Sequence, residues 1–399
     1  NKLPSEDIVS RDMDIAIASF APGCEIVKDK LVYKAVGVAD YEFDKTNKIR
    51  VKNRSLGIIH NKLHKCKNCG FSSITQDIDI CPICSNTLDI IDACSPLGFC
   101  VDYEKTPKDF NGVYDWHSPS SDIALDCSDR LDSIKPHTKN IHVRTNIKPS
   151  TGRVHQVNDN DGNLFTLGRR TESSEWVCRN TISDYKERNE LKLLFEKSYA
   201  FVSSKTTGVM ALSLESINEN VCLKPIENDN AHAVKAAFLS WGYLVRRSIA
   251  SFLDIDAQEL SVGFNIDAIT CNPEVFFVEK LDNGAGYCNY LTSGNIVNDA
   301  IIVPLIENGQ EYKKLTTQDH LKCTSSCYDC IRDYSNQNIH NIIDWRLGLD
   351  IARLSNDVNA HIGFDVEYWR EYIDVVIVNR LKRQGFIVNK KEDNIIIFS

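Results

Sequence analysis

The longest periodic pattern of apolar residues runs over residues 231–253. Apolar side chains recur there at steps of three and four, which is the spacing of one face of a helix. We therefore predict a core helix whose buried face carries Val234, Ala237, Phe238, Trp241, Leu244, Val245, Ile249 and Phe252. Similar patterns predict helices over 344–354 and 366–384, and the second of these ends before Gly385.

Alternating apolar and polar residues predict strands elsewhere. Residues 153–157 and 164–167 flank a segment rich in Asn, Asp and Gly, and this pair is expected to form a hairpin. Residues 199–202 and 209–214 are expected as two strands around residues 206–208. Further strands are expected at 25–38, where two form a hairpin turning at 28–30, and at 141–146, 260–264, 275–279, 386–388 and 395–398.

Two clusters of cysteines have metal-binding spacing. The first pairs Cys66-x2-Cys69 with Cys81-x2-Cys84. Paired CxxC knuckles around a short β-ribbon form a structural zinc site that holds together a unit too small to bury its own core. A redox role would normally need one CxxC pair beside a βαβ pattern. We therefore predict that these four cysteines bind zinc.

The second cluster contains Cys323, Cys327 and Cys330. Three thiolates this close repel one another unless a metal neutralises them, although a single cysteine is more often an ordinary buried thiol. Two histidines compete for the fourth position: His340 follows the last cysteine by ten residues, and His320 precedes the first by three. The predicted second zinc site is Cys323, Cys327, Cys330 and His340, with His320 as the alternative.

Charge and cysteine content narrow the class of protein. The 399 residues carry a net charge of -9, which argues against a uniformly basic nucleic-acid binder but leaves room for a local basic groove. Seven of the 15 cysteines fall into the two clusters, a usage that fits a reducing compartment, so we expect the cytoplasm. The apolar runs are shorter than the roughly 20 residues that span a bilayer. The chain begins at Asn1 without an initiating methionine, so we expect it to be a segment of a longer protein.

Two regions are candidates for contact with nucleic acid. Basic residues gather around the predicted hairpin, at Arg144, Lys148, Arg153, Arg169 and Arg170. The second cluster adds Tyr328, Arg332 and Tyr334, whose rings could stack on bases and whose arginine could contact phosphate. The alternative for the first group is a solvated strand face. For the second group, the alternative is that the side chains simply pack within the cysteine cluster.

A glycine-containing loop follows the strand expected at 275–279. A strand, such a loop and a helix N-terminus together can hold a phosphate, but residues 280–286 match neither the phosphate-binding loop of ATPases nor the dinucleotide fingerprint. A tight turn is the favoured interpretation. Glu279 and Asp282 could form a magnesium or acid/base pair, yet no third acidic partner accompanies them.

The second cluster and its surroundings carry a family resemblance. The segment Cys323-x3-Cys327-Tyr-Asp-Cys330-Ile-Arg-Asp-Tyr334-x-Asn-Gln-x2-His340, together with Asp282-Asn-Gly-Ala-Gly-Tyr287, resembles the MrfA-like zinc-binding (MZB) domain. That domain lies at the C-terminus of superfamily 2 DNA helicases and also occurs in helicase-associated proteins such as DrmB of the DISARM anti-phage system. Helicases of the Druantia defence type are similar to these proteins. The resemblance implies that Cys323, Cys327, Cys330 and His340 are zinc ligands. The motor motifs of such helicases are not present in this sequence.

These observations predict a mixed α+β or α/β fold with a small four-cysteine zinc ribbon and a mixed-sheet α/β zinc-binding domain. The expected parts are an N-terminal helix and hairpin at 1–60, the ribbon at 61–105, a β-rich connection at 106–220 and the MZB-type domain at 221–399. We expect a DNA-engaging module with two structural zinc ions that is not itself catalytic. Its expected partners are DNA, a superfamily 2 motor in cis or in trans and other subunits of a defence complex. The alternatives are an interaction scaffold without DNA contact and, third, a metal-dependent nuclease.

Overall fold

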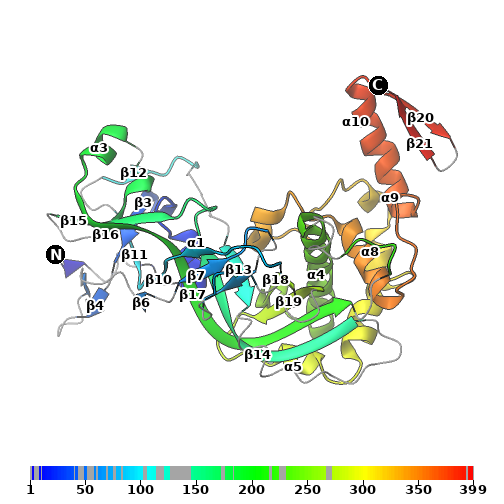
Figure 1. Cartoon of the computed structure of the whole chain (residues 1–399), viewed down its shortest axis with the longest axis horizontal. Coiled ribbons are helices and arrows are strands. Elements are labelled where there is room, and N and C mark those ends of the chain that lie inside the picture. The colour runs from blue at the N-terminus through cyan, green and yellow to red at the C-terminus, as the bar shows by residue number, and fades with distance from the viewer. Residues whose placement is uncertain are drawn as a thin grey trace. The chain divides into compact units, whose positions relative to one another are not determined.

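The computed structural model describes residues 2–3, 9, 11–39, 41–43, 49–51, 58–59, 62–68, 71–74, 78–81, 84–101, 106–113, 121–125, 145–171, 176–182, 184–214, 218–223, 231–266, 272–391 and 394–398. It forms two compact units (Figure 1). Unit 1 comprises Asn1–Asp129 and Arg153–Lys205, and unit 2 comprises Arg130–Gly152 and Thr206–Ser399. The predicted mixed α+β class is confirmed. Most of the sheet is antiparallel, and β10 (Ala93–Ser95) runs parallel to β17 (Leu193–Leu214).

Unit 1 is built on the first part of β17. This part pairs with β10 on one side and antiparallel to β15 (Phe165–Arg170) on the other. Since successive side chains point to opposite faces of a strand, Tyr199 and Phe201 enter one core while Ala200 and Val202 enter another. The second core also contains Leu63 and Ile74 of the ribbon, which lies over that face of the strand.

The other elements of unit 1 are short. Its helices are α1 (Met13–Ser19), α3 (Tyr185–Glu190) and a 3-10 turn at Arg179–Thr181. Its strands include β2 (Glu25–Lys28), β3 (Leu31–Val38), β6 (Ile58–Ile59), β11 (Phe99–Val101), β12 (Lys108–Asp109), β13 (Ser121–Leu125) and β16 (Trp176–Cys178). A small sheet is formed by β1 (Lys2–Leu3), β4 (Tyr41–Phe43) and β5 (Ile49–Val51), and the ribbon by β7 (Leu63–Lys65), β8 (Ser72–Ser73) and β9 (Asp89–Ile91).

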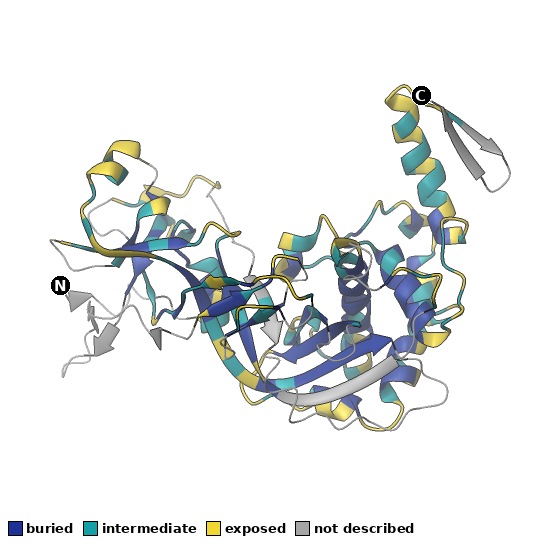
Figure 2. Cartoon of the chain, in the orientation of Figure 1, coloured by how far each residue is buried: buried dark blue, intermediate teal, exposed yellow. Residues whose placement is uncertain are grey.

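Unit 2 is organised around α4 (Ala231–Leu253), the helix predicted from the apolar period. It packs on β18 (Leu260–Ile266) and β19 (Pro273–Glu279), and β19 in turn pairs with the second part of β17. Figure 2 shows α4 and these strands among the most buried elements. Gly242 allows the close approach, because a Cβ there would lie 2.8 Å from Val262 Cγ1.

The remaining elements of unit 2 surround α4. They are α5 (Tyr287–Leu291), α6 (Gln310–Leu315), α7 (Gln318–Leu321), α8 (Trp345–Asn356), α9 (Glu367–Tyr372) and α10 (Val378–Arg383). Between them lie π-helical turns at Val297–Ile302 and Ile373–Ile377 and 3-10 turns at Ala257–Glu259, Val303–Leu305 and Tyr334–Ile339. The described part of the chain contains no helix long and apolar enough to cross a membrane.

The close contact between α4 and α8 gives the first prediction. A Cβ on Gly348 would lie 2.9 Å from the backbone oxygen of Ser240 and 2.7 Å from Leu244 Cδ1. Gly348→Ala should therefore lower the free energy of unfolding of unit 2 by about 1–3 kcal/mol, despite the better helix propensity of alanine. Urea unfolding followed by tryptophan fluorescence measures this, with Asn356→Ala on the exposed last turn of α8 as the control. Equal stability of the two variants would contradict the packing argument.

Two predictions about strands need correction. The predicted hairpin of 153–157 with 164–167 is wrong, because β14 (Thr145–Asn158) pairs with β13 and β17, whereas β15 pairs with β16 and β17. The turn expected between these two segments is present, but the strands on either side of it pair with other strands and not with each other. The two strands expected at 199–202 and 209–214 form one continuous strand, β17. The strands expected at 386–388 and 395–398 are β20 (Ile387–Lys391) and β21 (Asn394–Phe398), which form a separate two-stranded sheet.

Candidate functional site

The ribbon brings together three of its four predicted ligands. The Sγ atoms of Cys66, Cys81 and Cys84 lie within 4.8 Å of one another, and those of Cys66 and Cys84 are 3.4 Å apart. Backbone hydrogen bonds shape the two turns: Cys66 N–H donates to Phe71 O and Cys81 N–H to Asn86 O. Cys69 lies outside the described residues. Three converging thiols on two tight turns fit a tetrahedral metal ion.

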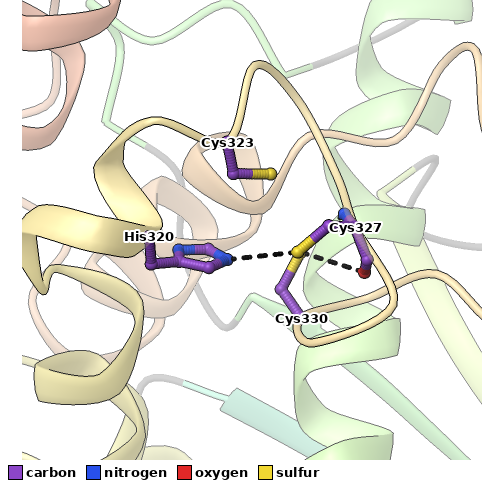
Figure 3. A group of neighbouring side chains, drawn as sticks. All are labelled: His320, Cys323, Cys327 and Cys330. Carbon is purple, nitrogen blue, oxygen red and sulfur yellow. Dashed lines mark hydrogen bonds between the residues drawn. The ribbon is translucent and has the colours of Figure 1, made fainter.

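The second cluster, here called the knuckle cluster, consists of His320, Cys323, Cys327 and Cys330. Their ligand atoms lie within 4.8 Å of one another, and Figure 3 shows the four side chains facing a common centre. Cys327 Sγ is 3.5 Å from Cys330 Sγ and 3.6 Å from His320 Nε2. Ligands of tetrahedral zinc with metal–sulfur bonds of about 2.3 Å lie about 3.8 Å apart, so little movement would admit the ion.

Hydrogen bonds orient these ligands. His320 Nδ1 is 2.8 Å from Leu315 O, and since a carbonyl can only accept, Nδ1 carries the proton. This tautomer leaves the Nε2 lone pair directed at the thiols, as in metal sites whose histidines are held by outer partners. Cys327 N–H donates to Cys330 Sγ at 3.0 Å, which fixes the position of this sulfur.

The pKa values of the thiols show that the group shares its protons unevenly. The pKa of Cys323 is lowered to about 4, chiefly by the hydrogen bond that it accepts from Cys330. The pKa of Cys330 is raised because it donates to Cys323 and because it is buried. A thiolate is therefore present near neutral pH, and a divalent cation would ionise the remaining thiols.

The structure does not bring His340 to the three thiols. Its Nε2 lies 2.7 Å from Asn336 Oδ1 and 3.1 Å from Asp333 O, at the end of the 3-10 turn Tyr334–Ile339. Partial burial and the nearby charge of Arg332 lower its pKa. The ring is thus held by its own hydrogen bonds, while His320, the alternative from the sequence, occupies the fourth position of the cluster.

This geometry gives the second prediction. His320→Ala should reduce zinc binding at the knuckle cluster by at least about 10-fold, because the neutral imidazole is lost as a ligand. His340→Ala, at a histidine engaged elsewhere, should retain the metal and serves as the matched control. Competition with a chromogenic chelator measures the affinity of each variant. Loss of the metal in His340→Ala but not in His320→Ala would overturn the assignment.

The loop after β19 is closed by its own glutamate. The buried carboxylate of Glu279 accepts hydrogen bonds from the N–H groups of Ala285, Gly286 (2.8 Å) and Cys288 (2.8 Å), at the start of α5. These donors are the ones a phosphate would use, so the loop is a tight turn, as favoured from the sequence. Glu279 faces inward while Asp282 is exposed, and this arrangement does not form the metal pair of the nuclease alternative.

The predicted nucleic-acid residues fall in both units. In unit 1, Arg153 is exposed on β14, Arg169 and Arg170 are half-buried on β15, and Arg144 lies outside the described residues. In unit 2, Tyr328 and Tyr334 are 68% and 62% exposed. Arg332 Nε donates to Ser326 Oγ at 2.8 Å.

One residue that the sequence did not single out joins residues 323–330, here called the knuckle loop, to α8 and α9. The guanidinium of Arg346, at the start of α8, is fully buried and donates to the carbonyl oxygens of Cys323 (2.6 Å), Thr324 (3.1 Å) and Tyr368 (3.1 Å). Aromatic rings of Trp345, Trp369 and Tyr372 surround it. A lone arginine in an amphipathic helix normally faces solvent, so the only signal was its place next to a tryptophan.

Comparison with known proteins supplies a relative. No protein-family model matches the chain. Over 380 residues it is 23% identical to the Druantia protein DruE of Escherichia coli (strain UMEA 4076-1), a match that covers 85% of this chain. The chain is similar to a Druantia protein. The resemblance to Druantia-type proteins that was expected from the cysteine motif is thereby confirmed. The chain spans only 19% of the length of DruE.

Solved structures of a helicase are also similar. Crystal structures of the DUF1998 helicase MrfA bound to DNA, and bound to DNA and AMPPNP, match 80% and 79% of this chain and 33% and 35% of theirs. The sequence identities are 12% and 11%, and the TM-scores are 0.36 and 0.26. TM-scores this low do not establish a shared arrangement.

Proposed function

We propose that this chain is a zinc-stabilised, DNA-engaging module of a Druantia-type anti-phage defence protein. The observation that carries the proposal is the match to DruE over 85% of the chain. The module works with an ATP-dependent superfamily 2 motor, either on the same polypeptide or on another subunit. Its role is to hold or guide DNA while that motor moves.

Zinc has a structural role in this proposal. Four protein side chains converge in the knuckle cluster, and three of the four predicted ligands converge in the ribbon. A complete protein shell leaves no coordination position for water, so the ions support folding and do not activate a nucleophile. Zinc suits these sites because thiolate and imidazole ligands in tetrahedral sets favour it over magnesium or calcium. Two zinc ions per chain are expected in elemental analysis of the purified protein.

DNA contact is supported by local charge and exposed aromatic rings. Arg153, Arg169 and Arg170 offer cations in unit 1, and the exposed rings of Tyr328 and Tyr334 offer stacking surfaces in unit 2. Such residues bind nucleic acid without reading its sequence, through phosphate charge and base stacking. The acidic net charge of -9 keeps this binding confined to local surfaces.

Fluorescence anisotropy with labelled single-stranded and duplex oligonucleotides tests this function. We expect dissociation constants of about 1–100 μM near physiological salt, which weaken as salt is raised. The control is the same protein with an uncharged nucleic-acid analogue of equal length. No binding of either DNA form at low salt would remove DNA engagement from the proposal.

A protein-interaction scaffold is the second candidate, and one feature favours it. The helical segment Ile373–Ile377 with α10 contains no buried residue, although it includes Val375, Val376 and Leu381. Figure 2 shows this segment in the colours of intermediate and exposed residues. Cross-linking of the chain to the remainder of a Druantia-type protein, repeated with Val375→Asp, tests this role. Association that survives nuclease treatment and is lost in the variant would support it.

A further inference from the structure

An exposed aromatic residue lies at an irregularity in the sheet of unit 1. Phe195 is 71% exposed and has a left-handed backbone with φ of +56°. The pairing of β15 with β17 shifts register there, since Leu167 pairs with Lys197 but Arg169 pairs with Leu194. Phe195 therefore lies in a β-bulge, a feature that re-aims side chains. A bulky residue is unfavourable in this conformation, and such strain is concentrated at functional positions.

The guanidinium group of Arg169 covers one side of the Phe195 ring. The guanidinium carbon of Arg169 lies 5.3 Å from the ring centroid, and its buried Nε has no hydrogen-bond partner among the described residues. In the part of the chain that the structure describes, no carboxylate pairs with Arg169. The neighbouring Glu196 is already engaged, because Arg179 binds its carboxylate through Nε and Nη2. The positive charge at Phe195 thus remains available to a ligand.

The same segment presents a second pair of this kind. Tyr185 on α3 is 71% exposed, and the guanidinium carbon of Arg188 lies 5.6 Å from its ring centroid. Arg179 also donates to the carbonyl oxygens of Arg188 (2.6 Å) and Leu191 (3.0 Å), which ties α3 to the bulge. Residues 165–197 carry seven Lys or Arg and six Asp or Glu, whereas the whole chain has 46 and 55.

We propose that this segment, the aromatic tip formed by Tyr185, Arg188, Phe195 and Arg169, binds unpaired nucleobases of single-stranded DNA. The inference rests on the proposed function and names its contact surface. An exposed ring backed by a guanidinium offers a flat face for a base and a cation for the adjoining phosphate. Local positive charge on an acidic chain favours a nucleic acid over an apolar protein surface, and the bulge holds the ring away from the sheet.

Oligonucleotide binding by variants of the full chain tests the tip. Phe195→Gly removes the ring, and it should leave the fold intact because glycine adopts a φ of +56° without strain. We expect it to weaken binding of an oligothymidine by about 5- to 100-fold, without changing the salt dependence. Arg169→Ala should instead lower the slope of log affinity against log salt by about 0.7. Phe195→Trp should bind at least as tightly as the wild type.

The control is Phe364→Ala, since Phe364 is 68% exposed but packs against Trp369 and not an arginine. Equal binding by Phe195→Gly, Phe364→Ala and the wild type would overturn the aromatic tip while leaving DNA engagement in place. Equal losses on single strands and on blunt duplex would overturn the preference for unpaired bases. A wild-type chain that binds neither DNA form would overturn the proposed function together with this inference. Phe195→Trp binding as weakly as Phe195→Gly would exclude stacking.

Discussion

Cys327→Ser should release one of two zinc ions and unfold unit 2 while the ribbon keeps its metal. Cys327 Sγ contacts both Cys330 and His320, so its loss opens the centre of the knuckle cluster. Binding of a structural zinc ion provides about 10–16 kcal/mol, which equals or exceeds the whole stability of a typical domain. Serine is a poor zinc ligand at neutral pH, since a hydroxyl does not ionise there.

Loss of this zinc ion should unfold the whole of unit 2, because the knuckle loop belongs to the main core of that unit. Cys323, Cys327 and Cys330 pack in the same apolar cluster as Ile331 and Trp345. Unfolding of the loop would expose this core. The ribbon contributes to a different cluster in unit 1, where Leu63 and Ile74 pack beside Ala200, so its zinc is expected to remain.

Zinc content and near-ultraviolet circular dichroism of the purified variant measure the two effects. Cys222→Ser is the matched control, because it removes an exposed thiol of unit 2 outside both clusters. A chelator titration should reproduce the variant's spectrum in the wild-type chain. A Cys327→Ser protein that retains two zinc ions and native aromatic signals would refute a structural metal at the knuckle cluster.

Local patterns were sufficient to predict the elements whose formation depends on nearby residues. The helix over 231–253 follows from its apolar period, and the hairpin of β2 and β3 turns at Asp29 and Lys30, the positions expected from the sequence. The three thiols of the knuckle cluster also converge as their spacing indicated. Each of these features is encoded within a few turns of helix or one short loop.

Long-range features could not be predicted in the same way. Residues 153–157 and 164–167 satisfy a hairpin pattern, yet β15 finds its partners in β16 and β17 because pairing depends on the whole sheet. The position of the two histidines depends on their hydrogen-bond partners: Asn336 engages His340, and Leu315 O orients His320. Two further features depend on backbone geometry that sequence spacing does not reveal. These are the hydrogen bonds of Glu279 to the loop N–H groups and the β-bulge at Phe195.

Arg346→Met should destabilise unit 2 by about 3–5 kcal/mol, because it removes the cation beside a largely buried carboxylate and the donor of three carbonyl groups. Arg346 Nη1 lies 3.2 Å from Asp344 Oδ1, and its other N–H groups bind Cys323 O, Thr324 O and Tyr368 O. Arg346→Lys should not restore stability, since an ammonium has neither the fork geometry nor the planar face that packs between Trp345 and Tyr372.

The pH dependence of the Arg346→Met variant provides a specific signature. Burial already raises the pKa of Asp344 to about 6, and Arg346 opposes that rise. Without the arginine, the pKa of Asp344 should rise further. A carboxyl whose pKa is higher in the folded than in the unfolded state stabilises the fold below its unfolded pKa and loses that contribution as pH rises through the folded value. The variant should therefore be more stable at pH 5 than at pH 8, relative to the wild type.

A double variant separates loss of the ion pair from loss of packing. Asp344 is the N-cap of α8 and accepts the N–H of Arg346 at 2.9 Å, a role that asparagine also fills. Adding Asp344→Asn to Arg346→Met should recover part of the stability at pH 8 and abolish the pH dependence, as measured by urea unfolding. Arg380→Ala, on the exposed side of α10, is the control for removal of one positive charge. If Arg346→Met unfolds at the same urea concentration as Arg380→Ala, the buried arginine does not hold the knuckle loop to α8, and the zinc ion alone must fix that loop.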